Sequence, residues 1–164
     1  MPDSSPIPAL SDWQLHTAHR SQDVQLRALF AQVFGHVMSQ QEWDWKYQCT
    51  DLRGSLLTKS STAEVVAFFG GMPRTFSHQG HNIQAVQNGD VMVRPQERGV
   101  FSRKGAFYQV AHHFICQHLG VQAAYAFAFG FPGPRAFRLG VKLGLYRQAG
   151  CLQQLRWTAQ PAPW

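Results

Sequence analysis

The sequence has no long apolar run and few cysteines, and each shortage excludes a class of protein. None of its apolar stretches is long enough to cross a membrane. Met1–Ala9 lacks the basic and apolar regions of a secretory signal, so we expect a cytoplasmic protein that is not bound to a membrane. The cysteines are Cys49, Cys116 and Cys151, an odd number of widely spaced residues, which argues against a disulfide framework or a CxxC metal site. Cys116 falls in a predicted helix, where a small core residue is the expected role.

Acidic residues are also scarce, and the balance of charge is basic. The chain has 9 Asp and Glu against 15 Lys and Arg, a formal net charge of +6 and a pI near 9.7. This balance suits a polyanionic partner, either a phosphorylated coenzyme or a nucleic acid. The only run of like charge is Arg103-Lys104, so a mildly basic solvated surface is the alternative interpretation.

The length and composition predict one globular domain. A chain of 164 residues with 45% hydrophobic residues can bury one core. Residues 1–10 contain three prolines and two serines and are read as a flexible leader. Residues 11–157 form the predicted domain, and residues 158–164 form a tail.

A strand, a basic turn and a helix, from Asn88 to Leu119, organise the chain. Val91 and Val93 are β-branched and Pro95 closes their run, which predicts a buried strand. After Gly105, apolar residues recur at steps of three and four, which predicts one apolar face of a helix. These are Ala106, Phe107, Val110, Ala111, Phe114, Ile115 and Leu119.

The turn between the strand and the helix has the features of a phosphate-binding site. It contains Arg98, Gly99, Arg103, Lys104 and Gly105, and the helix that follows begins with unpaired backbone N–H groups. Glycine lets the main chain approach a ligand closely, and the helix N-terminus adds partial positive charge to that of the side chains. An ordinary turn with solvated charges is the alternative.

Two blocks of sequence resemble the GCN5-related N-acetyltransferase (GNAT) superfamily. The first is V-x-P-x-x-R-G, here Val93, Pro95, Arg98 and Gly99, which is similar to the family's coenzyme-binding motif. The second, Phe129–Leu145, resembles the family's later strand-to-helix element. Their order and separation are more specific than either block alone.

The resemblance implies an α/β (α+β) fold, with a mixed, mostly antiparallel central sheet, helices on both faces and a splayed pair of parallel strands. Residue patterns along the chain agree with this arrangement. We expect strands at 13–17, 54–59, 64–71 with a bent continuation, 83–86, 90–93 and 123–129, and a closing strand or hairpin at 146–157.

Helix signals are clearest near three helix ends. Ser21 or Asp23 can cap a helix over residues 24–34 that ends at Gly35. Ser39 precedes Glu42 by three residues, which is the spacing of a capping box. Pro134 suits the first turn of the last helix.

Three aromatic residues follow the second cap. Trp43, Trp45 and Tyr47 lie within five positions of one another. The packing of these rings into the core is the favoured interpretation, because aromatic side chains bury large areas. The alternative, which the resemblance suggests, is that they line the cleft for the acceptor substrate.

The resemblance implies acyl transfer from acetyl-CoA to an amine, by direct attack of the amine on the thioester. Acetyl-CoA is then a co-substrate, no metal is expected, and the partner is a small amine or a protein amine. The implied coenzyme-binding residues are Val91, Met92, Val93, Arg98, Gly99, Arg103, Lys104, Gly105, Ala106, Phe107, Phe129 and Phe137. The strand edge at 91–93 would pair with the pantetheine arm, and backbone amides at 103–107 would hold the pyrophosphate.

The catalytic groups are less clearly marked. Gly140 stands where many members of the family have a tyrosine that protonates the leaving thiolate, so Tyr146 is the nearest candidate acid, with strand packing as its alternative role. Asp90 is the candidate base, or else a cap for the turn at Asn88-Gly89. His112 and His113 point about 100° apart on a helix, so at most one faces inward.

The missing tyrosine leaves a second function open. A module with the same fold could bind acyl-CoA without turnover and act as a sensor or interaction domain. A nucleic-acid-binding domain is less favoured, because most aromatics lie in apolar runs rather than among Lys and Arg. The acceptor and the oligomeric state stay open, a homodimer included.

Overall fold

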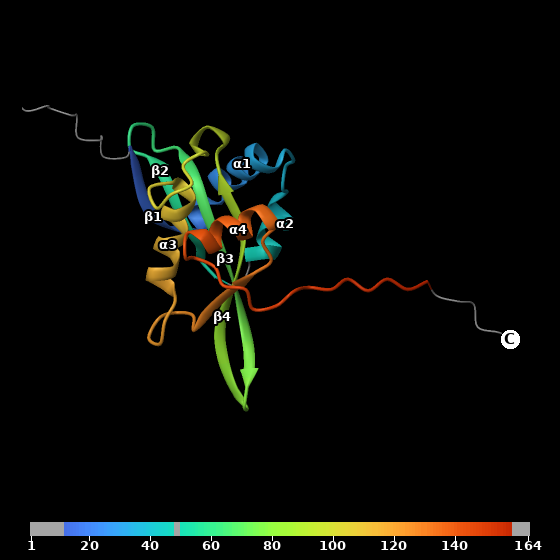
Figure 1. Cartoon of the computed structure of the whole chain (residues 1–164). Coiled ribbons are helices and arrows are strands. Elements are labelled where there is room, and N and C mark those ends of the chain that lie inside the picture. The colour runs from blue at the N-terminus through green and yellow to red at the C-terminus, as the bar shows by residue number, and fades with distance from the viewer. Residues whose placement is uncertain (1–11, 48–49, 159–164) are drawn as a thin grey trace, which may run out of the picture.

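A five-stranded mixed sheet forms the centre of the chain in this computed structural model, which describes residues 12–47 and 50–158 (Figure 1). The strands are β1 (Trp13–His19), β2 (Leu52–Lys59), β3 (Val65–His78), β4 (His81–Val93) and β5 (Phe127–Gly130). They lie side by side in chain order, antiparallel up to β4 and parallel between β4 and β5. The predicted fold class, a mixed and mostly antiparallel sheet with one parallel pair, is confirmed.

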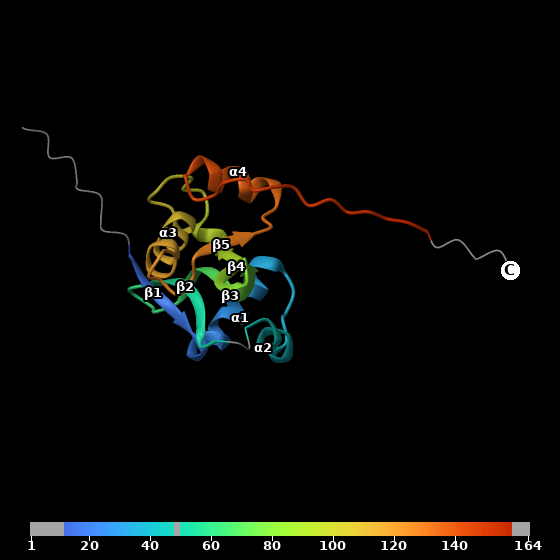
Figure 2. The same cartoon turned by 90° about the horizontal axis from the view of Figure 1, so that it is seen from below.

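Four helices cover the two faces of this sheet. They are α1 (Asp23–Phe34), α2 (Gln40–Tyr47), α3 (Ala106–His118) and α4 (Pro134–Lys142). Short 3-10 turns, η1 (Arg20–Gln22) and η2 (Pro95–Glu97), precede α1 and follow β4. Figure 2 shows α1 and α2 on one side of the sheet and α3 and α4 on the other.

The helix ends follow local sequence signals. Gly35 ends α1 with a φ of 77°, a left-handed conformation that glycine adopts without strain. The Ser39 amide donates to Glu42 Oε2 at 2.8 Å and the Glu42 amide donates to Ser39 Oγ at 3.2 Å, which confirms the capping box. The expected cap of α1 was wrong: Gln22 is the N-cap, and Asp23 is inside the helix with a buried side chain.

Each face of the sheet has its own hydrophobic core. On one face, α1 and α2 pack with Trp43 and Tyr47 fully buried against Phe68. On the other, α3 packs Phe114 against Phe69. Both cores therefore hold β3 and β4 in place from opposite sides.

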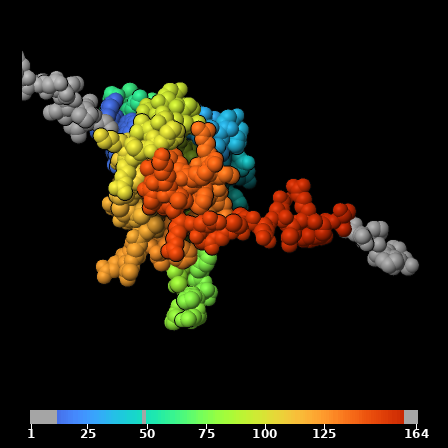
Figure 3. All heavy atoms as spheres, in the orientation of Figure 1, coloured from blue at the N-terminus to red at the C-terminus, as the bar shows by residue number. Residues whose placement is uncertain are grey.

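The strands β3 and β4 are longer than the sequence predicted. The β3 strand continues past Gly70-Gly71 through an irregularity in its pairing with β4, as expected, and reaches His78. Gln79 and Gly80 form the turn, both with positive φ, which is typical of a tight hairpin. The tip of this hairpin projects beyond the body of the molecule (Figures 1 and 3).

Three expectations were wrong. The strand expected at 123–129 is shorter and later, at Phe127–Gly130. Residues 146–157 form neither strand nor hairpin, because no strand lies beside them in the described ranges, and this segment runs away from the body (Figures 1 and 2). Cys116 is exposed on the outer side of α3 rather than in the core.

Other expectations fall outside what the structure describes or concern membranes. The predicted leader, residues 1–10, and nearly all of the predicted tail lie outside the described ranges. None of the described helices combines the length and the apolar character that a bilayer span requires.

Candidate functional site

A cleft opens where β4 and β5 separate. The β5 strand pairs with Ala85–Asn88 of β4, so the following β4 residues, 89–93, have no strand of the described chain beside them on that edge. A cavity of about 500 Å³ lies at this opening. Its walls include Asn88, Gly89, Asp90 and Val91 from β4, Phe129 and Phe131 from the β5 region, Phe137 from α4, and Tyr146. The separation supplies both free backbone groups and space for a ligand.

Asp90 lies at the beginning of the free edge, in a strained backbone conformation. Its φ is 50°, which is uncommon for a residue other than glycine. Its carboxylate accepts a hydrogen bond from Tyr47 Oη at 2.9 Å and forms an ion pair with Lys46 Nζ at 2.6 Å. Burial, together with the Asp90 charge, raises the pKa of Tyr47 well above its usual range, so the Tyr47 hydroxyl stays protonated and donates to Asp90. These contacts tie α2 to the cleft.

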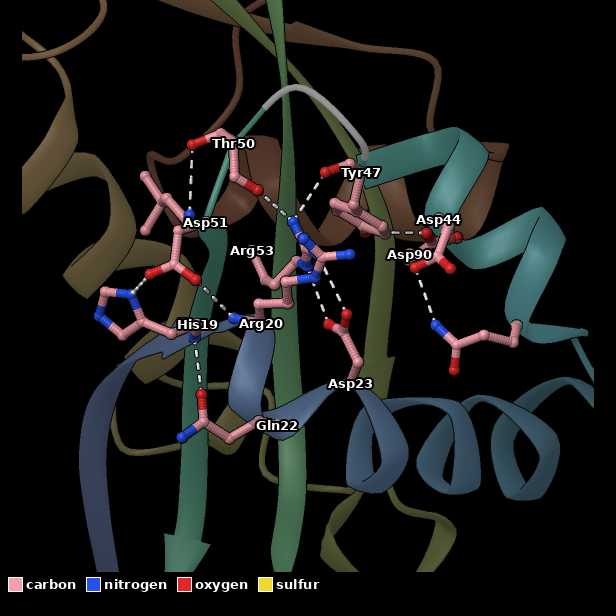
Figure 4. A network of polar contacts seen from close by, with 12 residues as sticks. His19, Arg20, Gln22, Asp23, Asp44, Tyr47, Thr50, Asp51, Arg53 and Asp90 are labelled. Atoms are coloured by element: carbon pink, nitrogen blue, oxygen red, sulfur yellow. Dashed lines mark hydrogen bonds and ion pairs between the residues drawn. The ribbon is translucent and has the colours of Figure 1, made fainter.

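A second buried group holds the same, C-terminal end of α2 (Figure 4). Arg53 of β2 pairs with Asp23 of α1, with Nε to Oδ1 at 2.8 Å and Nη2 to Oδ2 at 3.0 Å. Its Nη1 donates to the backbone carbonyls of Tyr47 at 2.7 Å and of Thr50. Arg53 is almost fully buried, and its charge is balanced by the Asp23 carboxylate.

The N-terminus of α3 has the free amides that a phosphate group needs. Gly105 is its N-cap and no side chain caps it. The amides of Lys104 and Gly105 already donate to Ser102, at 3.3 Å to Oγ and 2.9 Å to O. The first-turn amides, those of residues 106–108, donate to no acceptor in the described part of the chain. This helix end is therefore open to an anion.

The loop before α3 folds tightly against Gly105. A Cβ at that position would lie 2.0 Å from the Val100 carbonyl oxygen, so only glycine fits. Arg103 and Lys104 are exposed beside the open helix end, and Arg98 Nε donates to the Val93 carbonyl at 2.8 Å. The cations that the sequence pointed to therefore surround the end of β4 and the start of α3.

Tyr146 occupies the space that a side chain at position 140 would need. A Cβ on Gly140 would lie 2.0 Å from Tyr146 Cδ2. The amide of Tyr146 donates to the Gly140 carbonyl at 3.2 Å, and the ring also packs edge-on against Phe107, with centroids 6.1 Å apart. Burial raises the pKa of Tyr146 to about 12, so its hydroxyl is protonated at neutral pH.

The structure divides the predicted site residues into two groups. Asp90, Val91, Phe129, Phe137 and Tyr146 line the cleft. Residues 98–99 and 103–107 lie along the loop and the start of α3, outside the cleft lining, with Phe107 joining the two groups through Tyr146. The Met92 side chain is fully buried in the core under α1 and α2, and Val93 is partly buried on the α3 side.

A smaller hollow adjoins the cleft and was not predicted as a whole. It measures about 480 Å³ and shares Asn88, Gly89 and Phe131 with the cleft. Trp45, Lys46, Met72, Arg74 and Gln87 complete its lining. The packing role is confirmed for Trp43 and Tyr47, which are buried, whereas Trp45 is 73% exposed and lines this hollow. Contact with an acceptor stays a prediction.

No protein-family model and no curated protein matches the sequence. Solved structures do match. A Trypanosoma brucei acetyltransferase superposes with a TM-score of 0.64 at 15% identity, over 89% of this chain and 100% of that one. An aminoglycoside N-acetyltransferase in complex with CoA gives 0.62 at 14% identity, over 94% and 100%. Glucosamine-6-phosphate N-acetyltransferase from Arabidopsis thaliana gives 0.60 at 11% identity, over 90% and 99%.

The chain has the GNAT fold. At these identities the likeness establishes the fold and not the activity. The chain also matches Saccharomyces cerevisiae N-myristoyltransferase, but it spans only 26% of that protein's length, with a TM-score of 0.43.

Both resembling sequence blocks take their expected places in the GNAT fold. Val93–Gly99 leads from the end of β4 toward α3, and Phe129–Leu145 covers the end of β5 and all of α4. The cleft lies between these two blocks.

Sequence reasoning missed three residues around this site. Phe131, directly after β5, lines the cleft, and Lys46 lines the adjoining hollow and pairs with Asp90. Arg53 lines neither, but it fixes the end of α2 through the Tyr47 carbonyl. Only the adjacency of Lys46 to the aromatic cluster could have indicated one of them.

Proposed function

We propose that this chain transfers an acyl group, the acetyl group of acetyl-CoA, to the nitrogen of an amine. The observation that carries this proposal is the unpaired edge of β4 at residues 89–93, which opens on a cavity of about 500 Å³ beside an uncapped helix end. An elongated ligand with amide groups at one end and phosphates at the other fits this combination. The GNAT fold and the CoA bound in one structural neighbour support it.

The chain's own residues would hold acetyl-CoA at two places. The backbone at Val91–Val93 offers N–H and C=O groups to the pantetheine amides. The amides of residues 106–108, with Arg103 and Lys104 beside them, suit the pyrophosphate. Phe129 and Phe137 line the cleft between.

The reaction is a direct transfer. The amine nitrogen attacks the thioester carbonyl, a tetrahedral intermediate forms, and the C–S bond breaks as the carbonyl returns. The thiolate takes a proton from the Tyr146 hydroxyl, which burial keeps protonated, and the proton that the acylated nitrogen loses restores this hydroxyl. The thiolate can also leave without that proton, because the pKa of a thiol, roughly 8.5, is low enough for the anion to exist near neutral pH. Proton donation by Tyr146 therefore assists the reaction without being indispensable.

Asp90 as the base stays a prediction. Its carboxylate oxygens are engaged by Lys46 and Tyr47, so an incoming ammonium group has to compete with both. The same contacts hold α2 against the cleft, which gives Asp90 a positioning role that does not depend on proton transfer.

Calorimetry with acetyl-CoA, followed by a thiol-release assay with a panel of amines, tests the proposal. We expect binding, thiol release with at least one amine, and loss of binding in Gly105→Val, because a side chain there collides with the loop. Gly150→Val is the matched control, since a Cβ at 150 meets no atom within 4 Å. A second variant, Arg103→Gln with Lys104→Gln, weakens binding without adding bulk. Absence of binding at millimolar acetyl-CoA contradicts the proposal, and binding without thiol release favours the sensor.

A further inference from the structure

The hollow beside the cleft is placed to receive the acceptor. It shares Asn88, Gly89 and Phe131 with the cleft, so a molecule in it lies next to the free edge of β4. Lys46 and Trp45 of α2 form one wall, and Arg74 and Gln87 of the β3–β4 hairpin form the other.

The charge of this hollow is positive. Its two ionisable lining residues are Lys46 and Arg74, and no carboxylate lines it. Lys46 is neutralised by Asp90 at 2.6 Å, whereas Arg74 forms no ion pair with any carboxylate in the described ranges. The Arg74 guanidinium therefore presents a positive charge to the hollow that no carboxylate of the described residues neutralises.

Neutral groups hold Arg74 in place. Its Nε donates to Gln87 Oε1 at 3.1 Å and its Nη1 donates to the Pro73 carbonyl at 2.8 Å. These contacts orient the planar guanidinium and leave Nη2 for another acceptor, an arrangement suited to a carboxylate or phosphate oxygen. The exposed rings of Trp45 and Phe131 flank the same hollow and offer contact to an apolar body.

We infer that the acceptor is an amine that also carries an anionic group, a carboxylate or a phosphate, which binds Arg74. This inference rests on the proposed acyl transfer, which places the amine beside the thioester. It assigns Arg74 as the residue that selects the acceptor by charge.

Matched pairs of amines test this inference by binding and by turnover. Calorimetry on the CoA-bound protein compares phenylalanine with phenylalaninamide, and aminoethyl phosphate with ethanolamine, so that each pair differs in the anionic group. We expect the anionic member of at least one pair to bind about tenfold to a hundredfold more tightly. Arg74→Gln should abolish that difference, and Arg138→Gln, an exposed arginine of α4 outside the hollow, should not.

The two readouts separate failure of this inference from failure of the proposed function. Equal or tighter binding of the neutral member in both pairs overturns the inference, and so does an anion preference that survives Arg74→Gln. Selective binding of an anionic amine without thiol release sustains the charge assignment and contradicts acyl transfer.

Discussion

Gly140 has no side chain because the ring of Tyr146 fills its place. The chain turns back after α4 through Gly144, whose φ is 75°, and the amides of Leu145 and Tyr146 both donate to the Gly140 carbonyl. This turn brings the Tyr146 ring against Gly140 and into the lining of the cleft. A tyrosine at 146 therefore excludes a tyrosine at 140, because the two side chains would occupy the same space.

Steric coupling between these two positions gives the first prediction. Gly140→Ala places a Cβ 2.0 Å from the Tyr146 ring, so we expect a loss of about 1–3 kcal/mol in unfolding free energy, measured by urea denaturation. Adding Tyr146→Ala removes the collision, so the double variant should be less destabilised than the sum of the two single variants. Additive losses would show that the ring does not occupy this space.

The Tyr146 hydroxyl gives a kinetic prediction. Tyr146→Phe keeps the ring and removes the proton donor, so we expect kcat for acyl transfer to fall by about tenfold to a hundredfold, with little change in acetyl-CoA affinity. Stopped-flow thiol release and calorimetry measure the two quantities. An unchanged kcat would leave Tyr146 with a packing role alone.

The same hydroxyl predicts how stability depends on alkaline pH. Its pKa is raised from 10.0 to about 12 in the folded chain, so the folded state holds this proton more tightly than the unfolded state. The resulting stabilisation, about 3 kcal/mol, is present below pH 10 and is lost as pH rises from about 10 to about 12. Urea denaturation from pH 8 to 11 should show a steeper decline for the unaltered chain than for Tyr146→Phe. Parallel curves would contradict the burial of the hydroxyl.

Among the elements, α2 depends most on contacts distant in sequence. Lys46 and Tyr47 meet Asp90 of β4, and Arg53 of β2 joins the end of α2 to Asp23 of α1. A short helix of eight residues gains little stability from its own hydrogen bonds. The wall of the acceptor hollow therefore depends on two buried charged clusters.

Breaking the Arg53–Asp23 pair should be costly. Asp23→Ala leaves the buried Arg53 charge without its carboxylate, and we expect a loss of about 3–5 kcal/mol in unfolding free energy. Glu64→Gln is the control, because the Glu64 side chain is 45% exposed and its pair with Arg94 should contribute about 1 kcal/mol or less. Equal effects of the two changes in urea denaturation would contradict the burial of Arg53.

Local sequence patterns predicted most helices and strands, but they could not predict contacts between side chains far apart in the sequence. The strand at Val91 and Val93, the helix after Gly105 and the capping box at Ser39 all depend on residues within one or two turns, so the sequence shows them directly. The Asp90–Lys46 pair joins residues 44 positions apart, and no spacing rule points to it. Tyr146 was a candidate from its position alone, but its contact with Gly140 requires the turn at Gly144.

At the scale of the whole molecule, the fold follows from the order of strands and helices, and the expected strands that failed lie toward the end of the chain. The strand expected at 123–129 begins later, at Phe127, and the closing strand or hairpin expected at 146–157 does not form. Within the described chain these residues pair with no strand, so the outer edge of β5 stays unpaired. The free inner edge of β4, by contrast, opens on the cleft that the proposed coenzyme would occupy.

The most direct test of the central claim is the change in backbone amide NMR signals when CoA is added. The account predicts that the largest shifts fall on residues 106–108 at the start of α3 and on Val91 and Val93 at the free edge of β4. The amides of Lys104 and Gly105, which already donate to Ser102, should shift less. Shifts confined to other surfaces, or none at saturating CoA, would contradict the account.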